Sequence, residues 1–543
     1  MKQKTAYDIQ EVQEGINQNH SDEAEEKDAK ASQTKEKNPE AIESPQEQRA
    51  GENDESGTEE KTSQTQTEQK EETLAEQSES DVVAQADEQT QQTVYLSVLT
   101  GSDNQDGTLQ SPVKTLKKAL EKVSENGTIV ITGEKDDYWN NNAVVITEDT
   151  VINKGVTILR GPNCGLEMFS VQSGTLTIEN ATIDSQYKAG VTQRQGAVKV
   201  NGGNLIIKDG AKICNAGYFG VWIVNNSTVT MNGGEICNNG IHDLSSIYTG
   251  GVLMGSGTFT MNGGSIHDHV PKADWAGAGV KVNAGAEFIM NGGEISNNAA
   301  KSADGGAIYT GGTVTIKGGT LSNNTGNGNG GAIRAVNSTV TIGDGVQITG
   351  NHANGNNSGG GAIALSGSSS LTVGKAVISD NSAQYGGGIA SWSKGTMTLN
   401  GTTISDNRAV STTGWGNGGG ISINNAGALN INDGVITGNQ SLQGGGVGAY
   451  DTATVNISGN TVISGNTVTE NGGGGFCGYG SSKYIVGDGV QITGNHATGN
   501  NSGGGAVALW GTATATIGRA TLDGNDAQYG GGIALWSQGT TTL

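Results

Sequence analysis

A two-part phrase recurs along most of this chain and restricts the possible folds more than any other feature of the sequence. The first part is a glycine-rich turn followed by an apolar residue, as in the GGAI at residues 305–308, 330–333 and 360–363. The second part is a β-branched run, a turn and a run of the form Ile/Leu-x-x-Asn, as in TVTIKGGTLSNN. The apolar residue of the turn recurs at spacings of 25 to 32 residues from Val280 to Ile533.

Each period thus contains two or three short β-runs that alternate apolar with polar residues. Such runs cannot bury their apolar sides singly, so successive periods must stack. A helical repeat is excluded because no window shows a 3.6-residue apolar stripe, and a propeller blade needs about 40 to 45 residues. The sequence therefore predicts an all-β parallel β-helix whose coils lie about 4.8 Å apart.

The asparagine that ends the second phrase is expected to stack from coil to coil and to hydrogen-bond along the turn. One coil has His269 in this place, which we interpret as an interruption of the ladder. The asparagines are Asn239, Asn298, Asn324, Asn351, Asn381, Asn407, Asn439, Asn466, Asn495 and Asn525.

The N-terminal segment has a different composition. Residues 1–90 contain 25 Asp and Glu against 9 Lys and Arg, which accounts for 16 of the 23 net negative charges. Such a segment buries too little apolar surface to offset chain entropy, so residues 1–93 are predicted to be a disordered acidic low-complexity spacer.

Basic stripes interleaved with aromatics are missing from the whole sequence, which argues against a nucleic-acid partner. No apolar run in the sequence is long enough to cross a membrane.

Residues 94–133 precede the coils, which we assign to 134–543. Four apolar residues between Leu116 and Val123 fall at helical spacing, and Gly127 ends the pattern. A short amphipathic helix is therefore predicted to cover the apolar end of the first coil.

Two motifs carry a family resemblance. The GGAI and Ile/Leu-x-x-Asn phrases resemble the repeats of bacterial polymorphic outer membrane proteins, which usually have Phe where this chain has Ile or Leu. Residues of the 94–133 segment resemble the N-terminal cap of the pectate-lyase-like superfamily, namely Gly101, Ser102, Asp103, Asp106, Gly107, Thr108, Pro112, Thr115 and Leu116. Together the resemblances span residues 94–543, and they imply a right-handed parallel β-helix in a bacterial surface-adhesin setting.

A block duplication supports the repeat. Residues 343–399 match 487–543 at 40 of 57 positions. The second copy ends within a coil and would expose an unpaired β edge, so we expect further coils or a cap to follow, or end-to-end self-association.

An acidic spacer before a glycine-rich repeat body is typical of a surface protein. An extracellular or cell-surface location is therefore expected, with signal and anchor outside this chain.

Catalytic candidates are few. Enzymes of the superfamily act on polysaccharides with Arg or Lys bases, calcium-binding aspartates or paired aspartates. Paired carboxylates at coil spacing, which acid–base glycosidase chemistry needs, are not found. The strongest candidate cluster is His267, Asp268, His269 and Asp274, with His242 and Asp243 one coil earlier.

Imidazoles beside carboxylates can bind a metal or shuttle protons. The alternative is a polar loop where the ladder is interrupted, and we expect no cofactor or metal. His352 and His496 occupy equivalent places in the duplicated block and are assigned to the turn.

An aromatic series forms the candidate ligand-binding surface. Strand alternation sends the residue three positions after the apolar turn residue outward. That position holds Trp392, Tyr450, Tyr479, Trp510 and Trp536. A flat strip of such rings suits stacking against sugar rings or another protein. The alternative is that the rings stack on one another or lie beneath an adjoining domain.

Two cysteines stand at equivalent positions of adjacent coils. Cys214 and Cys237 each follow the isoleucine of their coil. A spacing of about 4.8 Å permits a disulfide, and a free half-buried pair is the alternative.

From these features we expect a non-catalytic adhesin or stalk of a bacterial cell-surface or secreted protein, with a polysaccharide or surface glycan as its partner. The first alternative is a polysaccharide lyase or glycoside hydrolase that acts in a groove along the β-helix. The second is a self-assembling structural module.

Overall fold

The computed structural model describes residues 91–133, 143–187, 195–241, 249–271, 277–411, 418–425, 427–500, 502–536 and 538–543. All of them belong to one compact unit, Gln85–Leu543. The acidic spacer predicted for residues 1–93 lies outside the described residues except for its last three positions. Those three are part of the first strand, which therefore begins three residues before the predicted boundary.

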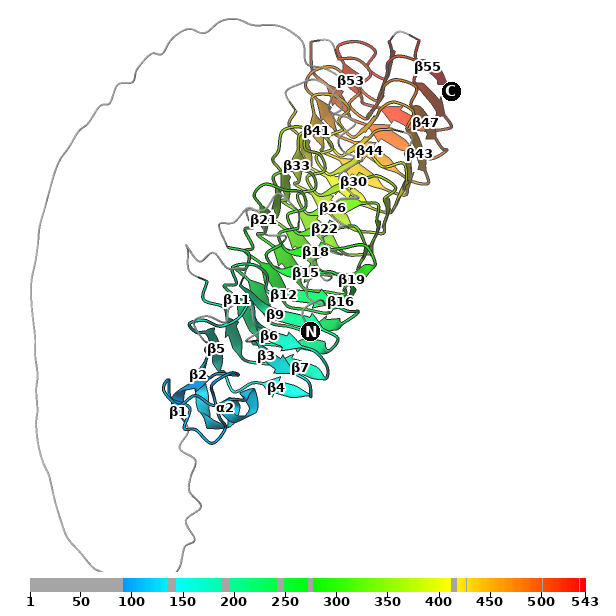
Figure 1. Ribbon diagram of the computed structural model, residues 1–543. Helices are drawn as coiled ribbons and strands as arrows, with labels where there is room; N and C mark the ends of the chain where they lie inside the picture. Colours follow the sequence, from blue (N-terminus) through cyan, green and yellow to red (C-terminus); the bar gives the residue numbers. More distant parts are fainter. Residues whose placement is uncertain are drawn as a thin grey trace, which may run out of the picture. The chain divides into compact units, whose positions relative to one another are not determined.

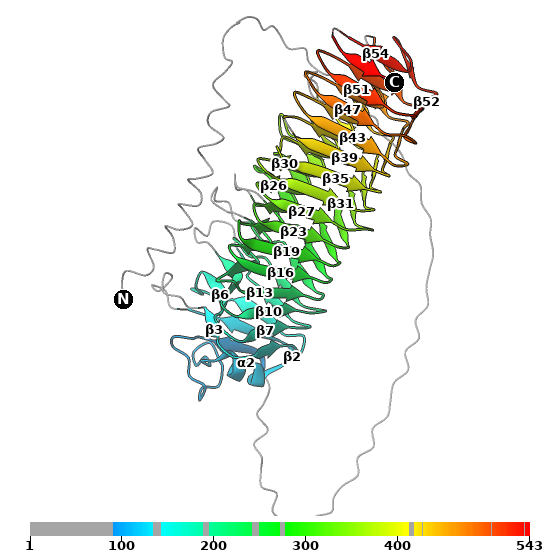
Figure 2. The same ribbon diagram turned by 90° about the vertical axis from the view of Figure 1, so that its right-hand side faces the viewer.

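The described chain is a parallel β-solenoid, as predicted, and its coils stack one on the next (Figures 1 and 2). Four sheets run along it. Sheet A has 16 strands from β1 (Gln91–Leu96) to β52 (Thr521–Asp523), and sheet B has 15 from β3 (Val144–Ile146) to β54 (Ile533–Leu535). Sheet C has 15 strands from β4 (Thr150–Ile152) to β55 (Thr540–Thr542), and sheet D has nine short ones from β21 (Ala299–Ala300) to β53 (Asp526–Ala527).

One coil shows how the phrase folds. Its strands are β30 (Ile363–Ser366) in sheet B, β31 (Ser370–Val373) in sheet C, β32 (Val377–Ser379) in sheet A and β33 (Ser382–Ala383) in sheet D. Ile378 is fully buried and lies in register between Ile348 and Ile404 of the neighbouring coils. Burial of each such side chain contributes about 1.5–3 kcal/mol. Inward aliphatic residues therefore form one continuous core.

The first glycine of the turn phrase has a left-handed backbone. Its φ angle is 72° at Gly330 and 68° at Gly360. A Cβ at these positions would collide with the carbonyl oxygen of Ile333 or Ile363. Glycine alone adopts this conformation without strain, which explains why the phrase begins with it.

The asparagine ladder is present and buried. The side-chain amide of Asn351 donates to the Leu321 carbonyl, 3.0 Å away, and to Oδ1 of Asn381 in the next coil, also 3.0 Å away. Its own Oδ1 accepts from the backbone and side-chain N–H groups of Asn324. Each buried amide thus finds partners in both neighbouring coils, as buried polar groups require.

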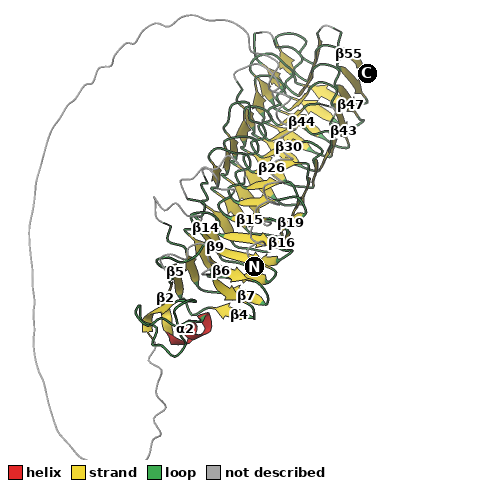
Figure 3. Cartoon of the chain, viewed as in Figure 1, coloured by secondary structure: helices red, strands yellow, loops and turns green. Residues whose placement is uncertain are grey.

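The predicted helix is α2 (Leu116–Lys122), which lies at the N-terminal end of the coils (Figure 3). Thr115 caps it by accepting from the Lys118 N–H, and Leu116 is buried in the core. The helix ends before Gly127 because the chain from Val123 onward pairs with β1 as strand β2 (Val123–Ile131). In the described part of the chain, no helix is long and apolar enough to span a membrane.

Candidate functional site

The most varied polar side chains lie on the outer face of sheet A, over five successive strands. These are β8 (Thr182–Asp184), β11 (Lys212–Cys214), β14 (Glu235–Cys237), β17 (Ser265–His267) and β20 (Glu294–Ser296). The central residue of each strand is a buried isoleucine, so the first and third residues point outward. The register places the third residues side by side in the order Asp184, Cys214, Cys237, His267 and Ser296.

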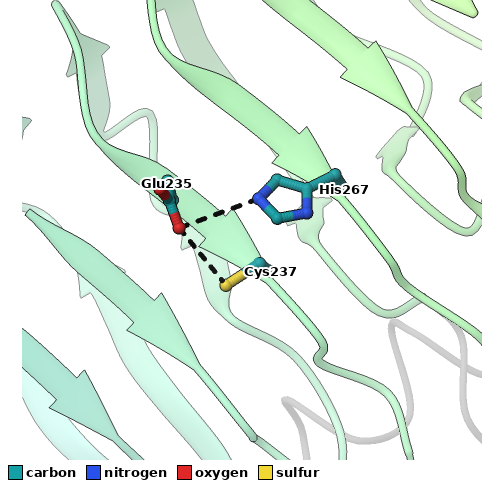
Figure 4. Close-up of side chains that lie close together, drawn as sticks. All are labelled: Glu235, Cys237 and His267. Carbon is teal, nitrogen blue, oxygen red and sulfur yellow. Dashed lines mark hydrogen bonds and ion pairs between the residues drawn. The ribbon is translucent and has the colours of Figure 1, made fainter.

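Three donor side chains converge around the Glu235 carboxylate. One ligand atom each from Glu235, Cys237 and His267 lies within 4.8 Å of the other two (Figure 4). The Sγ of Cys237 is 4.0 Å from Oε2 of Glu235, and Nε2 of His267 is 3.8 Å from the same oxygen. Glu235 and Cys237 share a face because they are two residues apart on β14, and His267 is next to Cys237 on β17. We call these three residues the Cys–His–Glu cluster.

The His267 ring is oriented from its other side. Its Nδ1 lies 2.7 Å from Oδ2 of Asp268. Asp268 has a left-handed backbone, with φ at 59°, which turns the chain sharply after the strand. The Asp268 carboxylate beside Nδ1 fixes the orientation of the ring, so Nε2 faces Glu235.

One lysine adds positive charge to the cluster. The Lys212 ammonium lies 3.1 Å from Oε2 of Glu235, and both side chains are about half exposed. An exposed pair of this kind stabilises the fold by no more than about 1 kcal/mol. The main effect of Lys212 is therefore on the electrostatic potential around the cluster.

The two cysteines lie side by side as free thiols. A hydrogen bond from the Cys214 thiol lowers the pKa of Cys237 against the opposing effect of burial, and the charges of Lys212 and His267 lower it further. The same hydrogen bond, together with burial, raises the pKa of Cys214. Cys237 is therefore the better nucleophile and metal ligand of the two.

His269 occupies the ladder position of its coil and keeps part of the hydrogen bonding found there. It is fully buried, and its Nδ1 accepts from the Asn239 N–H at 3.0 Å while Nε2 donates to the Ile236 carbonyl at 3.0 Å. The imidazole thus supplies the acceptor and one of the two donors that an asparagine amide supplies elsewhere. It makes no side-chain hydrogen bond to Asn298, so the side-chain ladder is interrupted at this coil, as predicted, while the backbone bonds are kept. Burial lowers the pKa of His269 to about 3.

The predicted catalytic cluster is therefore divided. His267 and Asp268 contact each other at the outer face, whereas His269 is enclosed between coils. Asp274, His242 and Asp243 lie outside the described residues. The two histidines assigned to the turn are exposed in sheet D, where His352 contacts the Ser382 hydroxyl and His496 pairs with Asp526.

The predicted aromatic strip is a stack whose rings cover one another. Tyr450 and Tyr479 have ring centroids 5.1 Å apart, Tyr479 and Trp510 4.7 Å, and Trp510 and Trp536 6.2 Å, with interplanar angles of 10° or less. Tyr450 was expected to be exposed, but only 9% of it is accessible. The ring faces therefore lie against one another within the stack.

Small residues beneath the stack explain this burial. The outward position of the underlying sheet B strands is Gly448, Cys477, Ala508 and Ala534 in successive coils. The Tyr450 ring folds back over this row, and its hydroxyl lies 4.0 Å from Sγ of Cys477. Trp392 lies half-buried outside the stack, above Gly359, because Asn424 occupies the equivalent position between it and Tyr450.

The sequence reasoning missed Glu235 and Lys212. A signal was present, because the strands read Lys-Ile-Cys, Glu-Ile-Cys and Ser-Ile-His in consecutive coils.

Comparisons with protein-family models, with curated proteins and with solved structures found no match. The fold defines a parallel β-solenoid protein.

Proposed function

We propose that this chain is the non-catalytic stalk or adhesin region of a bacterial cell-surface or secreted protein. The supporting observation is the unbroken core, since one cluster of buried residues extends from Val94 to Ile517. In such a solenoid each coil contacts its neighbours, so added coils lengthen it without altering its cross-section. This architecture suits a spacer that carries a binding surface away from a cell.

Membership of the pectate-lyase-like superfamily and the right-handed coil are part of the same proposal. The cap supports them, because residues that carry the resemblance make its contacts. The Asp103 carboxylate accepts hydrogen bonds from the backbone N–H groups of Lys114 and Thr115 at 3.0 and 2.9 Å, and from the Thr115 hydroxyl. These bonds hold the start of α2 at the end of the first coil.

The proposed partner is a polysaccharide or a surface glycan. Sugar rings stack on aromatic faces. In the stack, Tyr479 and Trp510 each have aromatic neighbours on both sides, so face-on contact is confined to its ends. Trp392 lies half-buried above Gly359, outside the stack, and is the second aromatic surface of the proposal.

The test is a glycan array probed with the full chain, combined with an assay for uronic-acid release from the same polysaccharides. Binding without product is the expected result, and product release would contradict the non-catalytic proposal. Comparing Trp392→Ala with the triple change of Tyr479, Trp510 and Trp536 to Ala separates the two aromatic surfaces. Trp222→Ala, outside both surfaces, is the matched control.

A lyase or glycosidase is the second candidate, and one observation favours it. The Lys212 ammonium lies beside the Glu235 carboxylate, and His267 approaches the same carboxylate. Acidic and basic side chains therefore share one face. If the release assay detects product, Lys212→Met and His267→Ser should each abolish it. Retention of activity in both variants would place any catalysis elsewhere.

A further inference from the structure

We propose that Cys214, Glu235, Cys237 and His267 bind a divalent cation of the zinc class on the outer face of sheet A. This site is independent of glycan binding and of the stalk function. Thiolate, imidazole and carboxylate together are the donor set that Zn²⁺ accepts, whereas Ca²⁺ and Mg²⁺ prefer oxygen alone.

The spacing of the donors is close to that of a metal site. Zinc takes sulfur at about 2.3 Å and nitrogen or oxygen at about 2.0–2.2 Å, so tetrahedral ligand atoms lie about 3.3–3.7 Å apart. The observed separations from Glu235 Oε2 are 4.0 Å to Cys237 Sγ and 3.8 Å to His267 Nε2. A contraction of about half an ångström is within reach of a glutamate side chain that is 44% exposed.

His267 has the arrangement of a metal ligand. Histidines that bind metals commonly donate the other ring N–H to a carboxylate, which fixes the tautomer and the ring orientation. Asp268 supplies that carboxylate at 2.7 Å from Nδ1. The lone pair of Nε2 then faces Cys237 and Glu235.

Cys214 is the fourth ligand in this proposal. It is directly in register with Cys237 on the neighbouring strand, and both residues are free cysteines. Two carboxylates, on Glu235 and Asp268, outnumber the single ammonium of Lys212 in the cluster. A divalent cation therefore reduces an excess of negative charge.

The neighbouring coils indicate which replacements the fold accepts. The position of Cys237 and His267 is held by Ser296, Ser322 and Ser379 in other strands of sheet A. The position of Glu235 is held by Gln347 in β28 (Gln347–Thr349). Cys237→Ser, His267→Ser and Glu235→Gln therefore remove a ligand while retaining a residue that this sheet already uses.

The test uses the reduced, metal-free full chain and Co²⁺ as a spectroscopic probe for Zn²⁺. We expect one Co²⁺ per chain to produce a thiolate charge-transfer band and the visible absorption of tetrahedral cobalt, and Zn²⁺ to displace both. Cys237→Ser and His267→Ser should weaken binding at least about tenfold, within the range expected when a metal site loses a ligand or its support. Cys214→Ser should halve the charge-transfer intensity because one of two sulfur ligands is lost.

Three controls make the result decisive. His352→Ala and Cys477→Ser remove an exposed histidine and a buried cysteine outside the site, and both variants should bind Co²⁺ like the parent. Circular dichroism verifies that each variant is folded. If the folded parent shows no tetrahedral cobalt spectrum, or if the spectrum survives in Cys237→Ser, the proposal is overturned.

Discussion

Two stretches of sheet A share a backbone and differ in what they present to solvent. In β11, β14 and β17 the outward residues include Lys, Glu, Cys and His, whereas β24 (Thr320–Ser322), β28 and β32 present Thr, Ser, Gln and Val. The central residue of each strand is a fully buried Ile or Leu in both stretches. The inward residues and the ladder therefore determine the conformation of the coil, and the outward positions can vary in their side-chain chemistry.

The ladder should be the most sensitive part of both stretches. Asn351→Leu leaves the Leu321 carbonyl and the N–H groups of Asn324 without partners in a buried site. At about 1–3 kcal/mol for each of these three unsatisfied groups, the free energy of unfolding should fall by about 3–9 kcal/mol. Guanidinium denaturation followed by circular dichroism measures it. Asn262→Ala, in an exposed amide row, is the control and should change it by less than about 0.5 kcal/mol.

The shared core predicts equal sensitivity beneath the two surfaces. Ile236→Ala, under the Cys–His–Glu cluster, and Ile378→Ala, in the Thr- and Ser-lined stretch, each open a cavity in a fully buried site. Each should reduce the free energy of unfolding by about 2–5 kcal/mol. The same denaturation experiment compares them. If Ile378→Ala is destabilising and Ile236→Ala is neutral, the two stretches do not share one core.

Acid should affect the coil that contains His269 more than the others. With a pKa of about 3 in the folded chain against an ordinary 6.5, His269 stays neutral when folded but takes up a proton on unfolding. Its stabilising contribution is complete above pH 6.5 and is lost as the pH falls toward 3, by up to about 1.4 kcal/mol per pH unit.

Denaturation at several pH values across this window, in the parent and in His269→Asn, tests the point. The asparagine restores the residue of the neighbouring coils and cannot titrate. As the pH falls, the free energy of unfolding of the parent should therefore decrease relative to that of His269→Asn. A constant difference between the two free energies would contradict a neutral buried histidine.

The aromatic stack should contribute modestly to stability. Tyr479 has a ring on each side, so Tyr479→Ala removes two stacking contacts and should reduce the free energy of unfolding by about 1–3 kcal/mol. Tyr479→Phe keeps the stack and is the matched control. Equal free energies of unfolding in the two variants would mean that stacking contributes nothing to stability.

The smallest effect is expected at the outward positions themselves. Cys237→Ser places in β14 the residue that β20 and β24 already carry, so without metal the free energy of unfolding should change by less than about 1 kcal/mol. Thermal unfolding with a chelator measures this. A large loss would show that the Cys–His–Glu cluster supports the coil as well as lying on it.

Much of the fold was predictable because its causes are local and repeated. Alternation placed Ile378 and its equivalents inside, and the helical spacing after Leu116 marked the cap. The end of that helix was missed because pairing of Val123 with β1 overrides local spacing. The burial of His269 was missed because its ring bonds to Asn239 and Ile236 only when the preceding coil is in place.

The outward surface was less predictable. Tyr450 was expected to be exposed, and its burial depends on Gly448 beneath it and Tyr479 beside it. The convergence of Glu235 with His267 likewise depends on which strand neighbours which. Alternation tells only that such residues point outward.

The sequence by itself determined a stacked β-coil with an aliphatic interior, glycine turns and an asparagine ladder, because each of these follows from a pattern within one period. Tertiary structure decided which outward side chains meet. Cys214, Cys237 and His267 are separated by 23 and 30 residues, and only the register between coils of unequal length brings them side by side. The physical reason is that side-chain contacts across parallel strands depend on strand alignment, which no single period encodes.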